Sequence, residues 1–135
     1  MTFVLAMIVG VVIAAPVLAL LAYIPRDRAL DLLAVQLGAI AAVYAGSSLA
    51  GGAIPVLAVE LVGVFAFAAV ALFGRWGSPT ILAAGYVGHG VWDAIHHLGA
   101  IPTFLPDWYA PFCLGYDGIF AAFVAVMFFR RPRPA

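Results

Sequence analysis

Residues 2–24 read TFVLAMIVGVVIAAPVLALLAYI and contain no charged side chain. A helix needs about 20 mainly apolar residues to cross the hydrocarbon core of a bilayer, so this stretch predicts a transmembrane helix. It lacks the basic segment that opens a signal peptide, and its apolar run is too long for one. We therefore expect this first helix to be retained in the protein.

The composition of the whole chain extends this prediction. Its 135 residues are 67% hydrophobic and 9% charged, whereas a soluble domain is about half apolar and about one quarter charged. This composition excludes a soluble enzyme and a disordered chain, and the few scattered arginines, with no lysine, exclude a nucleic-acid binder. The single cysteine, Cys113, excludes an internal disulfide and a multi-cysteine metal site. We expect one integral membrane domain over residues 1–135.

Four further apolar runs lie between helix breakers, at about residues 29–50, 55–73, 79–98 and 111–129. Prolines open the last three runs, and proline is favoured in the first helical turn. We expect Asp27 to cap the second helix and Ser78 to cap the fourth. The tail GSSLAGG of the second run, residues 46–52, is compatible with a loop.

The arginines predict an orientation. With five spans, all six arginines fall on one side of the membrane, and basic residues are concentrated on the cytoplasmic side. The sequence therefore predicts an all-α, multi-pass bundle of five transmembrane helices in the inner or plasma membrane, with its N-terminus out and its C-terminus in. The arginines are Arg26, Arg28, Arg75, Arg130, Arg131 and Arg133.

Small residues recur at every fourth position of the second run, a spacing that lets helix backbones approach closely in lipid. The pattern fits packing within one protomer, and it also fits a contact between copies in a homo-oligomer. These residues are Ala34, Gly38, Ala42, Gly46 and Ala50.

Three acidic residues fall inside predicted spans at similar depths. At 1.5 Å rise per residue, Glu60, Asp93 and Asp117 lie roughly 8 to 9 Å from the outer ends of their helices. We expect these carboxylates, from three different helices, to share one layer of the outer leaflet. Buried charges at this depth cost several kcal/mol unless they are paired, hydrated or metal-bound, so they predict a functional site.

The fourth run adds histidines to this layer. Residues 88–97 read GHGVWDAIHH, and helical spacing places His89, Asp93, His96 and His97 within an arc of about 100°. Imidazole and carboxylate ligands suit zinc or iron. The sequence thus predicts a divalent metal ion held by His89, Asp93 and His96, with His97 and Asp117 as further candidate ligands.

Two metal-free interpretations stay open. The histidines and acids would form either a functional polar cavity or a hydrogen-bonded lock that fixes how the helices pack. In both, His97 faces lipid headgroups, Cys113 is a buried apolar side chain, and Trp92 belongs to the interfacial aromatic belt.

The segment His-x-x-Trp-Asp-x-x-His-His at residues 89–97, followed by Cys-x-x-Tyr-Asp at residues 113–117, resembles a family of small bacterial membrane proteins of unknown function. The resemblance covers roughly residues 85–120 and implies no activity. More distantly, His and Asp ligands on transmembrane helices resemble membrane zinc hydrolases of the ceramidase and adiponectin-receptor type. This chain departs from them because it has five predicted spans rather than seven and no separate His-x-x-x-His motif near its C-terminus.

These observations lead to a functional hypothesis. We expect a metal-dependent membrane enzyme, such as a hydrolase, acting on a membrane lipid or another amphipathic substrate from the outer leaflet. Glu60 would be the general base, and Tyr86 or Tyr116 would donate to an oxyanion. A metal or proton transporter or sensor is the first alternative, although Gln36 is the only polar group expected deeper in the bundle. The other is an accessory subunit of a larger membrane complex.

Overall fold

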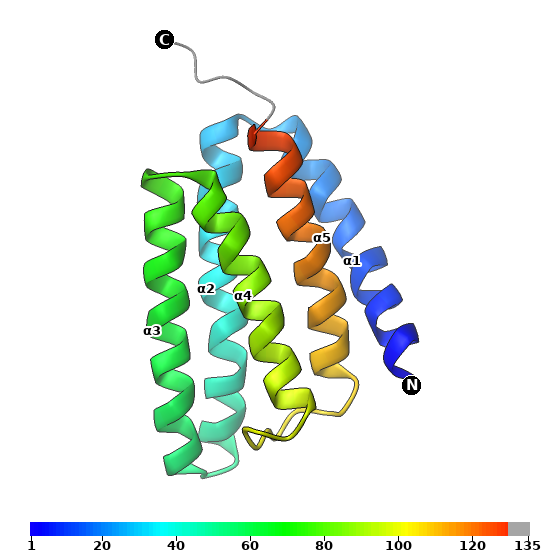
Figure 1. Ribbon diagram of the computed structural model, residues 1–135, viewed down its shortest axis with the longest axis vertical. Coiled ribbons are helices and arrows are strands. Elements are labelled where there is room, and N and C mark those ends of the chain that lie inside the picture. The colour runs from blue at the N-terminus through cyan, green and yellow to red at the C-terminus, as the bar shows by residue number, and fades with distance from the viewer. Residues whose placement is uncertain (130–135) are drawn as a thin grey trace.

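The computed structural model describes residues 1–129, which form five α-helices and no strand. Figure 1 shows them as an up-and-down bundle in which consecutive helices run in opposite directions. Each apolar run found in the sequence corresponds to one helix, so the predicted all-α architecture is confirmed. The helices are α1 (Phe3–Tyr23), α2 (Arg26–Ala50), α3 (Ile54–Trp76), α4 (Pro79–His97) and α5 (Tyr109–Phe129).

Four of the helices, α1, α2, α3 and α5, are long and apolar enough to cross a membrane, which indicates a membrane protein. At one end of the bundle, here called the arginine end, α2 begins with Arg26 and α3 carries Arg75 in its last turn. The opposite end, here called the loop end, holds residues 98–108, which join α4 to α5. Three of the arginines that underlie the predicted orientation, Arg130, Arg131 and Arg133, lie outside the described residues.

The helix ends confirm one predicted cap and correct another. The Ser78 side chain accepts a hydrogen bond from the backbone N–H of Thr80, as a capping serine does. The prediction for Asp27 is wrong, because Pro25 occupies the cap position of α2 and Asp27 lies in the first turn, where a negative charge favours the helix dipole. The tail of α2 is helical through Ala50 rather than looped.

Small residues bring α1 and α5 together. Ala6, Gly10 and Ala14 are buried at successive turns of α1. A Cβ atom at Gly10 would overlap the carbonyl oxygen of Phe112, and one at Gly115 would overlap the backbone of Met7. Close backbone contact therefore requires glycine at both positions.

The small-residue stripe on α2 has a different environment. Ala42, Gly46 and Ala50 are exposed, and a Cβ atom at Gly38 or Gly46 would meet nothing within 4 Å. Packing within one protomer, one of the two interpretations of the spacing, is therefore wrong for this part of the helix.

Helix α4 packs against three of the other four helices. It packs against α5 on one side and against α3 on the other, and it also contacts α2, while α1 packs against α5. Apolar side chains fill the half of the bundle nearer the arginine end, among them Leu30, Leu33, Leu82, Phe120 and Val124. The buried acidic residues lie nearer the loop end.

Candidate metal centre

Three buried side chains from α4 and α5 form the centre of the site. His89 and Asp93 lie one turn apart on α4, and Asp117 faces them from α5. The Nδ1 atom of His89 is 2.7 Å from Oδ2 of Asp117 and 3.4 Å from Oδ2 of Asp93. Each residue offers one ligand atom, and these atoms lie within 4.8 Å of one another. We call this group the triad.

The triad leaves polar atoms without hydrogen-bond partners. Among the buried side-chain atoms of residues 1–129, Nε2 of His89, Oδ2 of Asp93 and Oδ1 of Asp117 have none. The exposed fraction of each of the three residues is at most 1%. An unpaired buried polar atom costs free energy, so three such atoms in one cluster are the feature of this site that a bound group would satisfy.

The chemistry of the donor set fits a divalent cation. Two ionised carboxylates in one buried site repel each other, and a cation with charge +2 would compensate both. One imidazole and two carboxylates are ligands suited to zinc and to iron. The described residues therefore fit a metal ion, and the fit involves three of the five ligands predicted from the sequence.

His96, a predicted ligand, turns toward α3 rather than toward the triad. Its Nε2 atom is 2.7 Å from Oε1 of Glu60, and its Nδ1 atom is 2.9 Å from the carbonyl oxygen of Trp92. A carbonyl oxygen only accepts hydrogen bonds, so Nδ1 carries a proton. The contact at Nε2 is a hydrogen bond between His96 and Glu60 and needs one further proton, carried by one of the two side chains. Trp92 also donates from Nε1 to Oε2 of Glu60 at 3.3 Å.

Tyr44 on α2 connects the triad to the Glu60–His96 pair, and the sequence analysis did not include it. Its hydroxyl donates to Oδ1 of Asp93 at 2.8 Å, and its ring stacks on His96 with centroids 3.9 Å apart. The sequence held a signal for this residue. Tyr44 lies six residues before the end of α2 at Ala50, which is about 9 Å and matches the depth of the acidic residues.

The other predicted residues lie outside the triad. His97 is exposed, and its ring contacts that of Phe3. The hydroxyl of Tyr86 lies 2.9 Å from the carbonyl oxygen of Leu33 and 3.3 Å from Oε1 of Gln36. Gln36 also donates from Nε2 to the hydroxyl of Tyr116. Both tyrosines thus belong to a polar network around Gln36.

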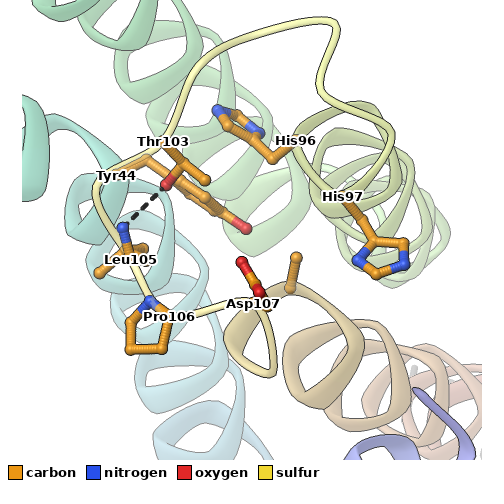
Figure 2. A pocket seen from close by; sticks show the side chains of 8 residues that line it. Tyr44, His96, His97, Thr103, Leu105, Pro106 and Asp107 are labelled. Carbon is orange, nitrogen blue, oxygen red and sulfur yellow. Dashed lines mark hydrogen bonds between the residues drawn. The ribbon is translucent and has the colours of Figure 1, made fainter. Parts of the chain in front are cut away.

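Two cavities near the loop end reach the site. Figure 2 shows the first, a cavity of about 220 Å³ to which Tyr44, His96 and Asp107 contribute. The second, of about 150 Å³, includes Asp93 in its lining. His97 and Ala110 line both cavities, so the two spaces adjoin. One member of the triad, Asp93, and one of the Glu60–His96 pair, His96, therefore form part of the cavity walls at this end, although both side chains are buried.

The fold and the site define an all-helical membrane protein with a buried histidine–carboxylate cluster. The chain belongs to a family of unknown function, DUF6010, whose family model matches residues 5–131. This membership fits the expectation of a family of unknown function. No curated protein and no solved structure matches the chain.

Proposed function

We propose that this protein is a metal-dependent membrane enzyme that acts on a lipid or another amphipathic substrate. His89, Asp93 and Asp117 would hold a divalent cation, zinc or iron. One observation carries the proposal: three fully buried residues present ligand atoms within 4.8 Å of one another, and each residue also keeps a polar atom without a partner.

The chemistry of this enzyme divides between two groups of residues. A bound divalent cation supplies Lewis-acid chemistry, which acidifies a water molecule or polarises a substrate oxygen. Glu60 and His96 are joined by a buried hydrogen bond, so we assign proton transfer to this pair, with Glu60 as the base. The Tyr86 hydroxyl donates to Leu33 and Gln36, which argues against it as an oxyanion donor. The Tyr116 hydroxyl accepts from Gln36 and keeps its own proton, so Tyr116 is the better candidate for that role.

We propose that α4 also crosses the membrane, which gives five spans in the inner or plasma membrane. The outward residues Ile81, Val87 and Val91 of α4 are apolar and exposed, whereas its histidine and acidic residues at 89, 93 and 96 are buried in the bundle. These three polar residues, which lower the hydropathy of α4, therefore do not face lipid, and the exposed His97 is the last residue of the helix. The arginines support an N-terminus outside and a C-terminus inside.

Access from one end favours an enzyme over a transporter or a metal sensor. The cavities that reach the site open near the loop end. Toward the arginine end, the Gln36 network is followed by the buried apolar side chains of Leu30, Leu82 and Val124. A transported ion would need polar groups along this second half. An accessory role in a larger complex, or a homo-oligomer, would use the exposed stripe of α2.

Elemental analysis of the purified protein tests the proposal. We expect about one zinc or iron per chain after purification without chelator, and loss of that metal in His89→Ala and Asp93→Asn. His97→Ala is the matched control, because His97 is an exposed histidine on the same helix, and it should keep the metal. A parent protein that binds neither zinc nor iron when these are supplied would overturn the proposal.

A further inference from the structure

Three cavities along α4 and α5 adjoin one another through shared lining residues, and together they are called the track. The polar cavity of about 220 Å³ shares His97 and Ala110 with the cavity of about 150 Å³ that contains Asp93. The second cavity shares Ala94 and Leu114 with a third, of about 240 Å³, that extends to Val87. The track thus runs from the loop end, past the triad, along the groove between α4 and α5.

The length of the track matches one leaflet of a bilayer. From His97 to Val87 it follows ten residues of α4, which is ~15 Å at 1.5 Å rise per residue. The hydrocarbon core of a bilayer is about 30 Å thick, so the track spans about half of it. An alkyl chain that lies in the outer leaflet would fit along this groove.

The two ends of the track differ in chemistry. Tyr44, His96, Thr103 and Asp107 line the cavity at the loop end, and Figure 2 shows their side chains around it. The third cavity is lined mostly by apolar side chains such as Val91 and Leu114, with the glycines of α4 and α5 as its floor. This polarity fits an amphiphile whose head group lies at the loop end.

The charge at the loop end selects the kind of head group. Asp107 places an exposed carboxylate in the polar cavity. The chain has no lysine, and the arginines of the described part, Arg26, Arg28 and Arg75, lie at the opposite end of the bundle. The lining of the polar cavity contains no guanidinium or ammonium group, and its basic side chains are the histidines His96 and His97. A cationic head group would pair with the carboxylate of Asp107.

We propose that this track binds a single-chain amphiphile with an amine head group, so that the bonds next to the head lie beside Asp93. That this amphiphile is a substrate rests on the proposed function, because the inference names the substrate class of the proposed enzyme. The charge pair with the head group uses Asp107, which lies outside the triad, so binding is measurable without metal.

The test uses the full chain, freed of metal with a chelator and placed in nanodiscs of phosphatidylcholine. Dodecylamine and dodecyl phosphate are titrated by calorimetry, with empty nanodiscs as the blank. We expect saturable binding of dodecylamine at one per chain and at least tenfold weaker binding of dodecyl phosphate. Asp107→Asn should weaken dodecylamine binding about fivefold, as expected for a partly exposed charge pair. Asp27 is an exposed acidic residue at the arginine end, so Asp27→Asn should leave dodecylamine binding unchanged.

A second pair of variants tests the apolar groove. Gly118 and Gly46 are both exposed glycines inside helices, and a Cβ atom at either would meet nothing within 4 Å. Gly118 lines the third cavity, so Gly118→Leu should abolish dodecylamine binding, whereas Gly46→Leu should leave it unchanged.

The outcomes separate this inference from the proposed function. Binding of dodecylamine with these variant effects supports the inference even if the protein holds no metal. Equal binding of the amine and the phosphate, no saturable binding, or unchanged binding in Gly118→Leu would overturn it. That result would leave the metal measurement on the triad unaffected.

Discussion

Tyr44 donates a hydrogen bond to Asp93 across the interface between α2 and α4, with 2.8 Å between the hydroxyl and Oδ1. Both residues are buried, so water does not compete for this bond. The same tyrosine ring stacks on His96. The Tyr44 side chain therefore orients a triad carboxylate and packs against His96, the partner of Glu60.

Removal of the Tyr44 hydroxyl should weaken metal binding without unfolding the protein. In Tyr44→Phe the ring still packs on His96, but Oδ1 of Asp93 loses its donor. Loss of such an outer hydrogen bond costs about 10- to 100-fold in metal affinity. Zinc competition with a fluorescent chelator measures the change. Tyr23→Phe, at a 90% exposed tyrosine, is the control, and equal zinc affinities in both variants would contradict the prediction.

Glu60 should be dispensable for the metal, although Tyr44 and His96 connect it to the triad. It pairs with His96 and Trp92 rather than with His89, Asp93 or Asp117. Glu60→Gln is therefore expected to retain the metal stoichiometry of the parent, whereas Asp117→Asn loses it. Elemental analysis of the two variants side by side makes the comparison. Metal loss in Glu60→Gln would contradict this prediction and would mean that the triad and the Glu60–His96 pair form one metal site.

The sequence predicted the layer of acidic residues but not how they pair. Rise per residue fixes depth, so Glu60, Asp93 and Asp117 could be placed near one level. Helical spacing also put His89 and His96 on one face of α4. That face, however, packs against α3 as well as α5, and spacing alone does not say which neighbour a side chain meets.

The small-residue stripes show the same limit. Spacing of four identifies helices that can approach closely, and both α1 and α2 carry such a pattern. The structure uses Ala6, Gly10 and Ala14 of α1 for packing inside the protomer, whereas much of the α2 stripe is exposed. The α1 stripe packs inside the protomer because Gly115 of α5 lies opposite it. Which helix lies opposite a stripe follows from the topology of the bundle and not from the sequence of the stripe.

Metal should stabilise the folded protein against heat. A ligand that binds only the folded state at about 100 times its Kd contributes about 2.7 kcal/mol, which corresponds to a rise in Tm of several degrees. We expect this rise when zinc is added to chelator-treated protein. The rise should vanish in His89→Ala and persist in His97→Ala, as followed by differential scanning fluorimetry. A full rise in His89→Ala would place the metal elsewhere.

The contact between α1 and α5 should be intolerant of even one methyl group. In Gly115→Ala the new Cβ atom would lie 2.8 Å from Cα of Met7, which is backbone and cannot rotate away. Overpacking of this kind costs about 1 to 3 kcal/mol. Gly118→Ala, three residues further along α5, meets open space and should raise stability by up to ~1 kcal/mol, because alanine favours helix more than glycine does. Unfolding in detergent, followed by helical circular dichroism, measures both variants. Equal effects at the two positions would show that helix propensity, rather than contact with α1, determines the cost.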